Sequence, residues 1–130
     1  MSSCRCLIPV SFGELVDKIT ILEIKTHYLQ GEALLHVMEE LSLLRQVCQD
    51  LAQPIDHQFV LELQHVNQTL WAIEDRIRLK EQWQQFDAEF LTLARQVYLQ
   101  NDCRAAIKRR INLRYGSELC EEKSYNTAGY

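Results

Sequence analysis

The sequence has few residues that break helices and no long apolar run. Only four glycines and two prolines occur among 130 residues, and Pro9 and Pro54 both fall outside the periodic apolar segments. This composition argues against a turn-rich β fold and favours long helices. No stretch approaches the roughly 18 consecutive apolar residues that a membrane-spanning helix needs, so we expect no membrane partner.

Positive charge is not in excess either. The net charge is -4, so the chain as a whole does not attract nucleic acid, and we expect no nucleic-acid partner. The first ten residues lack the apolar run of a secretion signal. The five cysteines are an odd number and are interpreted as reduced thiols. We therefore expect a cytoplasmic protein.

Spacing patterns typical of metal, cofactor and catalytic sites are also missing. Cys4 and Cys6 are too close for a zinc knuckle, and no second pair completes them. The four histidines include no i,i+4 pair, and the chain has no phosphate-binding glycine loop and no nucleophile signature. We expect no metal and no cofactor, and no residue is assigned a catalytic role.

Apolar residues spaced by three and four cover most of the chain, whose length suits one domain. Ser11 and Glu14 form a capping box, Asp56 is a second helix start, and Asn101-Asp102 is a weak break that offers a third. The segment after Gln84 is either a separate helix or a continuation of the one before it. The expected helices cover about 11–30, 32–53, 56–84, 86–100 and 102–115, followed by a tail over 117–130.

These segments predict an all-α fold, an antiparallel bundle of four to five helices with a short extended N-terminal lead-in and a C-terminal tail packed back on the bundle. The first helix is apolar on two sides, so we expect it to be central. The seams over 34–51 and 59–77 are expected to form a hairpin. Seams of this length also suit a homodimer interface.

Two sets of polar residues lie along the edges of the predicted core. One set recurs on the third helix and the other on the last, each along one helix face. Solvated faces usually carry interchangeable Glu, Lys and Gln, whereas Asn, Trp and Arg beside a core indicate a polar network or a binding surface. The two sets are Asn67, Trp71, Glu74 and Arg78, and Asn101, Arg104, Lys108 and Asn112.

The last predicted helix is strongly basic. Five basic residues occur within eleven positions, and Asn101 and Asn112 add amide groups beside them. Such a face suits a phosphate or a carboxylate. The alternative is that the acidic tail folds back and neutralises it. The basic residues are Arg104, Lys108, Arg109, Arg110 and Arg114, and the acidic ones are Glu118, Glu121 and Glu122.

Asp17 projects from an apolar side of the first helix, with Lys18 next to it. A buried carboxylate is either a general acid or base with a shifted pKa or one half of a buried salt bridge. The partners considered for such a bridge are Arg78, Arg104 and Lys108.

The chain resembles a family of short bacterial helical proteins with no assigned function. Four ordered blocks carry the resemblance, which extends from about Ile8 to Tyr125, while residues 31–59 contribute little. It implies that the tail belongs to the fold or the site, and that the three helical blocks meet in one place. The blocks are VSFGELVDKITILEIK over 10–25, Asn67 with Leu70-Trp71 and IEDRIR over 73–78, Asn101-Asp102 with Arg104 and Ile107-Lys108, and EEKSY over 121–125.

Three functions remain open at this level. The first is a binding or adaptor module whose polar and basic cluster recognises an anionic small molecule or a charged partner segment. The second is a metal-independent enzyme that uses Asp17 or Glu74 on a phosphorylated or carboxylated substrate. The third is a structural homodimer without a ligand site. The candidate ligand-binding residues are Asp17, Lys18, Asn67, Trp71, Glu74, Arg78, Asn101, Arg104, Lys108, Asn112, Glu121, Glu122 and Tyr125.

Overall fold

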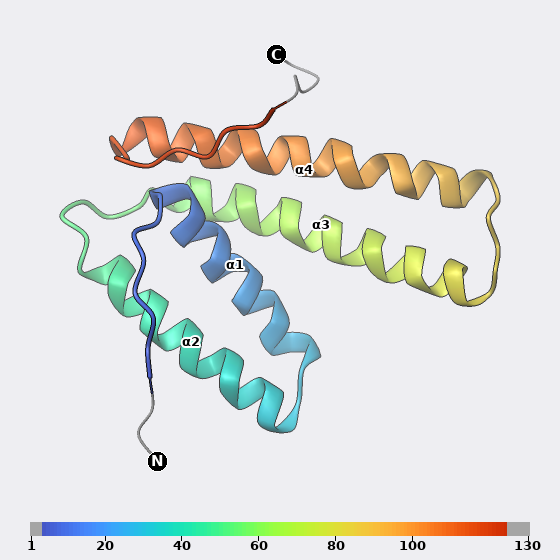
Figure 1. Cartoon of the computed structure of the whole chain (residues 1–130), viewed down its shortest axis with the longest axis horizontal. Coiled ribbons are helices and arrows are strands. Elements are labelled where there is room, and N and C mark those ends of the chain that lie inside the picture. The colour runs from blue at the N-terminus through green and yellow to red at the C-terminus, as the bar shows by residue number, and fades with distance from the viewer. Residues whose placement is uncertain (1–3, 125–130) are drawn as a thin grey trace.

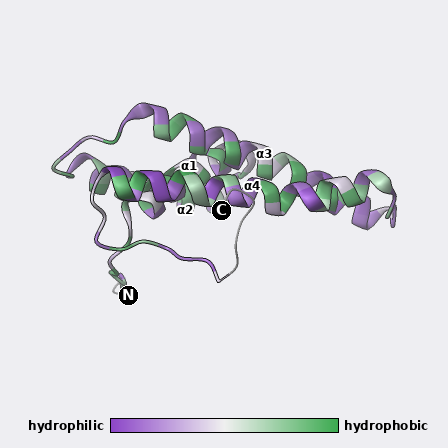
Figure 2. Ribbon diagram, turned by 90° about the horizontal axis from the view of Figure 1, so that it is seen from above, coloured by the Kyte–Doolittle hydropathy of each residue, from purple (hydrophilic) through white to green (hydrophobic). Residues whose placement is uncertain are grey.

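The computed structural model describes residues 4–124 and shows four helices, with no strand among those residues. They are α1 (Phe12–Tyr28), α2 (Gly31–Gln49), α3 (His57–Gln82) and α4 (Ala88–Arg114). The predicted all-α bundle is confirmed. Figure 1 shows α3 and α4 as a long antiparallel hairpin, with α1 and α2 packed near the end where α3 begins and α4 ends. Apolar and polar residues alternate along each helix in Figure 2, as amphipathic helices require.

Side chains mark three of the helix starts. Ser11 Oγ accepts a hydrogen bond from the backbone N–H of Glu14 at 3.0 Å, and Asp56 Oδ1 accepts one from Gln58 at 2.9 Å. Asp87 does the same for α4, accepting from Phe90 at 2.9 Å. These carboxylate and hydroxyl oxygens satisfy N–H groups that have no partner within the helix. The starts expected at Ser11 and Asp56 are confirmed.

The break expected at Asn101-Asp102 is wrong. Helix α4 runs through both residues without interruption, so one helix replaces the two expected over 86–100 and 102–115. The side chain of Asn101 donates to the backbone carbonyl of Val97 at 3.1 Å, one turn earlier, and does not cap a new helix. Local preference for a cap is overridden because α4 packs along α3 over most of its length.

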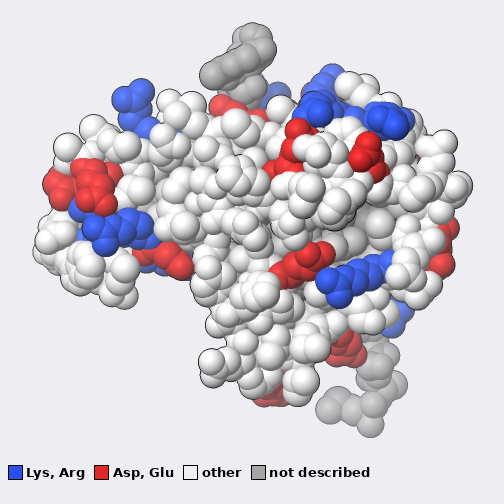
Figure 3. All heavy atoms as spheres, turned by 180° about the vertical axis from the view of Figure 1, so that it is seen from behind, with Lys and Arg blue, Asp and Glu red and all other residues white. Residues whose placement is uncertain are grey.

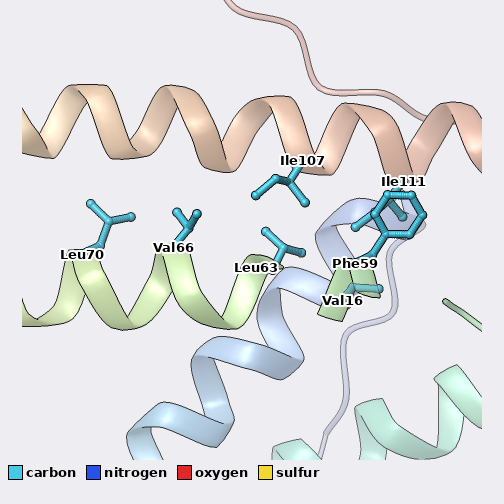
Figure 4. Close-up of a cluster of buried hydrophobic side chains, with 7 residues drawn as sticks. All are labelled: Val16, Phe59, Leu63, Val66, Leu70, Ile107 and Ile111. Carbon is cyan, nitrogen blue, oxygen red and sulfur yellow. The ribbon is translucent and has the colours of Figure 1, made fainter. Parts of the chain in front are cut away.

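Helix α1 is central, as its two apolar sides predicted. One side enters a cluster with α3 and α4, and the other enters a second cluster with α2. Figure 4 shows the first cluster, with side chains from α3 and α4 facing each other and Val16 of α1 at one end. The first cluster contains Val16, Phe59, Leu63, Val66, Leu70, Ile107 and Ile111. The second contains Leu15, Ile19, Leu22, Val37 and Leu41.

The expected hairpin between the seams over 34–51 and 59–77 is wrong. Among the described helices, α2 packs only against α1, whereas α3 packs against α4 and α1. Each seam is buried, but against a different helix from the one expected. Periodicity identifies the apolar face of a helix and does not identify the helix that covers it.

The start of α1 lies directly against α4. A Cβ atom at Gly13 would be 2.7 Å from the backbone oxygen of Lys108 and 3.0 Å from Asn112 Oδ1. The N–H of Gly13 donates to that same Asn112 oxygen at 2.7 Å. The close approach requires glycine here, and it places the first turn of α1 beside the basic end of α4.

The tip of the α3/α4 hairpin holds a buried lysine. The Lys80 side chain is only 2% exposed, and its Nζ donates to both carboxylate oxygens of Asp87 at 2.9 Å and lies 3.4 Å from Glu89. The hydrogen bond with Asp87 raises the pKa of Lys80, and the same bond lowers the pKa of Asp87. Arg76, followed by Lys80, lowers the pKa of Glu89. These charges hold the end of α3 against the start of α4.

Acid should therefore loosen the hairpin tip. A carboxylate with a lowered pKa stabilises the fold above its unfolded-state pKa, roughly 4, and this contribution is lost as the pH falls through the folded-state value. The raised pKa of Lys80 keeps its own contribution until strongly alkaline pH. Amide hydrogen exchange over residues 80–90 should be slower in the wild type than in Lys80→Met at pH 7, and the difference should shrink below pH 4.

Lys18→Met is the matched control, because Lys18 is exposed and only 3.6 Å from Glu40. It should leave exchange at the tip unchanged. A difference between wild type and Lys80→Met that stays constant with pH would contradict the ion-pair account.

Candidate functional site

A carboxylate at the centre of the molecule joins three helices. Asp17 of α1 is 0% exposed, and both of its oxygens accept hydrogen bonds from Arg104 of α4. Asn67 of α3 donates from Nδ2 to Asp17 Oδ1 and to Thr20 Oγ1, both at 2.9 Å. Every residue of this network except Thr20 was singled out from the sequence, and Arg104 is one of the three partners considered for Asp17.

This network holds Arg104 in place, and part of the Arg104 side chain stays at the surface. Nε and Nη2 of Arg104 donate hydrogen bonds to Asp17, and the Arg104 side chain remains 30% exposed. The hydrogen bonds to Asp17 raise the pKa of Arg104, whereas partial burial lowers it. The negative charges of Asp17, Glu14 and Glu74 also raise this pKa. The guanidinium is therefore a fixed positive group with one edge free of Asp17.

One turn further along α4, Lys108 forms a second connection. Its Nζ lies 2.6 Å from Glu14 of α1 and 3.8 Å from Glu121 of the tail. Ser11 Oγ donates to the same Glu121 oxygen at 2.9 Å, and Asn112 Nδ2 lies 3.5 Å from it. A tail carboxylate thus lies among a hydroxyl, an amide and an ammonium group.

The tail follows α4 from its end back along the helix. Arg109 Nη1 is 3.2 Å from Glu122, and Lys123 Nζ is 3.2 Å from Asp102. The expectation that the tail lies against the basic helix is confirmed over the described residues 117–124. Figure 1 shows this segment running beside α4.

A cleft of about 490 Å³ lies between α4 and the tail. Its volume falls within the range of small-molecule sites. Its polar lining comes from six residues already identified from the sequence as candidates, and its apolar lining from Val97, Tyr98 and Ala105. The six are Asn101, Arg104, Lys108, Asn112, Glu121 and Glu122, joined by Arg109 and Lys123.

Several sequence candidates lie away from this cleft. Lys18 is exposed and faces Glu40 of α2. Trp71 stacks on Tyr28, with ring centroids 4.8 Å apart, and its buried indole N–H has no acceptor among the described residues. Glu74 and Arg78 are exposed, and within the described part of the chain no ion pair joins them. Tyr125 lies outside the described residues.

Sequence reasoning missed five contributors to this region. Thr20 is buried and accepts from Asn67, but a threonine within an apolar helix face gives no distinct signal. Val97 and Ala105 were interpreted only as part of a helical pattern, and Tyr98 was not singled out. Lys123 was not considered, although its position in the EEKSY block was a signal that could have found it.

None of the described helices is long and apolar enough to cross a membrane. Over residues 4–124, no group of three or more His, Cys, Asp or Glu side chains is placed to hold a metal ion.

The Asp17–Arg104 pair should be essential to the fold. Arg104→Met leaves the carboxylate of Asp17 buried without its cation, which typically costs about 3–5 kcal/mol. Asp17→Asn combined with Arg104→Met removes both charges and should recover a large part of that loss. Urea unfolding of the single and double variants measures the difference.

Arg109→Met is the matched control, because it removes an exposed arginine from the same helix, and such pairs are worth about 1 kcal/mol or less. Equal losses of unfolding free energy in Arg104→Met and Arg109→Met would show that the buried pair stabilises the fold no more than an exposed pair does.

Comparison with known proteins gives one family match, which covers the part of the chain that contains the polar network. No curated protein and no solved structure matches the chain. One family model matches residues 7–129, a range that includes all four helices, Asp17, Arg104 and the tail. The chain belongs to DUF6165, a family of unknown function.

Proposed function

We propose that this protein is a binding module, and that the cleft between α4 and the tail takes the anionic group of a small molecule or of an acidic partner segment. The observation that carries the proposal is the placement of Arg104. Its guanidinium is fixed from behind by a buried carboxylate and lines a cleft in front. A cation held in this way loses little conformational entropy when it binds an anion.

The charges of the cleft suit an anion. Four of the lining residues carry positive charge and two carry negative charge, so the lining has a formal charge of +2. Asn101 Oδ1 is 3.5 Å from Arg104 Nη1, a long contact that leaves this part of the guanidinium available. Carboxylate and phosphate groups bind arginine through such paired N–H donors. Val97, Tyr98 and Ala105 supply an apolar wall for the rest of a ligand.

The tail occupies part of the same space. Glu121 lies 3.8 Å from Lys108, whereas Glu14 lies 2.6 Å from it, so Lys108 holds the tail carboxylate less closely than it holds Glu14. A ligand anion would replace Glu121 beside Lys108 without disturbing the contact between α1 and α4. The proposal therefore includes an exchange between a ligand anion and the tail carboxylate.

An enzymatic role for Asp17 finds no support. Its carboxylate is wholly buried and bonded to Arg104 and Asn67, so it cannot contact a substrate in the cleft. Glu74 is not among the residues that line the cleft.

Anion binding should depend on the lysine and arginine that line the cleft. Inorganic phosphate and succinate, titrated separately in calorimetry, should bind the wild type. Lys108→Met and Arg109→Met should each weaken binding by about tenfold or more, because each removes a charged hydrogen-bond donor. Native mass spectrometry of the protein as purified should also show a bound mass that is lost in Lys108→Met.

Arg110→Met is the matched control. Arg110 follows Arg109 on the helix, is similarly exposed, and pairs with Glu62 at the same distance of 3.2 Å, but it does not line the cleft. Its loss should change affinity less than twofold, and Glu121→Gln should increase affinity by freeing Lys108. The proposal fails if neither anion binds, or if Arg110→Met weakens binding as much as Arg109→Met.

A further inference from the structure

The α3/α4 hairpin has a third face that the other described residues, 4–124, leave uncovered. In α4, residues 92, 96, 99, 103, 106, 110 and 113 follow one another at alternating spacings of four and three. In α3, residues 61, 65, 68, 72, 76, 79 and 83 form a similar series. Spacings of three and four place residues on a single stripe of a helix. We call the two stripes together the outer face of the hairpin.

The outer face points away from both α1 and the cleft. At 100° per residue, its stripe on α3 lies roughly 140° from the seam that packs on α4 and roughly 120° from Asn67 and Trp71, which contact α1. Its stripe on α4 lies on the other side of the seam from Arg104 and Lys108. Because the helices are antiparallel, both stripes fall on the same side of the hairpin.

This face is apolar at several points and has small residues near its middle. The exposed fractions are 45% for Leu61, 40% for Leu79, 51% for Trp83 and 68% for Leu113. Ala72 and Ala106 are exposed between them. Small residues allow a second helix to approach closely, and tryptophan is enriched at protein interfaces.

Charges on the outer face are few and lie toward its two ends. At the tip, Arg76 pairs with Glu89 at 3.0 Å, and near the base Arg110 pairs with Glu62 at 3.2 Å. Figure 3 shows the same distribution from behind, with charged side chains at the tip on the left, basic side chains above the base, and a largely uncharged surface between.

We propose that a second copy of this chain packs against the outer face, so that two hairpins form an antiparallel four-helix interface. The size fits: helices of 26 and 27 residues are about 40 Å long, and two side by side are about 20 Å wide, giving about 800 Å² per copy. That is the area each partner contributes to a stable interface of standard size.

The face is also complementary to itself under a two-fold rotation. The pairs Glu62–Arg110 and Arg76–Glu89 show that residues near 70 and near 100 lie at the same level of the hairpin, midway along the outer face. A rotation about that level brings Leu61 against the partner's Leu79. It also brings Arg110 against the partner's Glu89. At these two places apolar meets apolar and cation meets anion, which suits an isologous interface.

The central alanines provide the first test. A glutamate at the centre of the interface would be buried without a partner, so Ala72→Glu and Ala106→Glu should each raise the dimer dissociation constant about a hundredfold or more. Ala94→Glu is the matched control, because Ala94 is an exposed alanine of α4 on another face. It should leave the dimer unchanged. Native mass spectrometry and sedimentation of the full chain measure all four proteins.

Cysteine cross-linking provides an independent test of the geometry. Cys103 lies in the outer face within about one turn of the two-fold level, so two copies would hold their Cys103 thiols about 10 Å apart along the helix axis. A variant that keeps Cys103 as its only cysteine should give a covalent dimer with a bismaleimide reagent. A variant that keeps only Cys120, which lies on the tail beside Asn112, should not.

Three outcomes would overturn the proposal. The wild type could be a monomer at micromolar concentration. A dimer could persist in both Ala72→Glu and Ala106→Glu. A dimer could also be lost in Leu35→Asp but not in these variants, which would assign the contact to the exposed apolar face of α2, where Leu35 is 66% exposed. None of these outcomes bears on anion binding in the cleft.

Discussion

The ion pair between Asp17 and Arg104 is the constraint on which the rest of the structure depends. It joins residues 87 positions apart, and Asn67 adds α3 to the same carboxylate. A buried carboxylate tolerates few alternative arrangements, because any packing that separates it from its cation leaves an unpaired charge in the core. Apolar side chains on α1 would tolerate small rotations or shifts against α3 and α4. The pair therefore selects one register of α1 from the several that apolar packing alone would allow.

The same pair holds a positive charge at the surface of the cleft. Arg104 is a structural residue on its Asp17 side and a surface cation on its cleft side, so one side chain connects the core to the cleft. Lys108 repeats this arrangement one turn later, between Glu14 of α1 and Glu121 of the tail. The cleft is thus formed by helix–helix packing on one wall and by a folded-back segment on the other. The first wall is rigid, whereas the second depends on surface ion pairs that water and salt weaken.

The sequence predicts local features well and long-range partners poorly. The caps at Ser11 and Asp56, the two apolar sides of α1 and the burial of Asp17 follow from spacing and residue type, which act over one or two turns. The continuity of α4 through Asn101 and the pairing of α3 with α4 depend on contacts between distant segments. The choice of Arg104 over Arg78 as the partner of Asp17 has the same origin. Arg78 has the same chemistry, and only the crossing of α1 over the hairpin separates the two.

The position of α1 between two apolar clusters determines the order in which the fold can come apart. Among the described helices, α2 contacts α1 alone, so its release would expose one side of α1 and leave the cluster of Val16, Leu63 and Ile111 intact. Release of α1 would open both clusters and would also separate Asp17 from Arg104 and Asn67. Partial opening should therefore begin at α2, as the element of lowest local stability, while α1, α3 and α4 behave as one cooperative unit. Because its release leaves the cluster between α1, α3 and α4 intact, α2 is also the described helix freest to change in sequence and length.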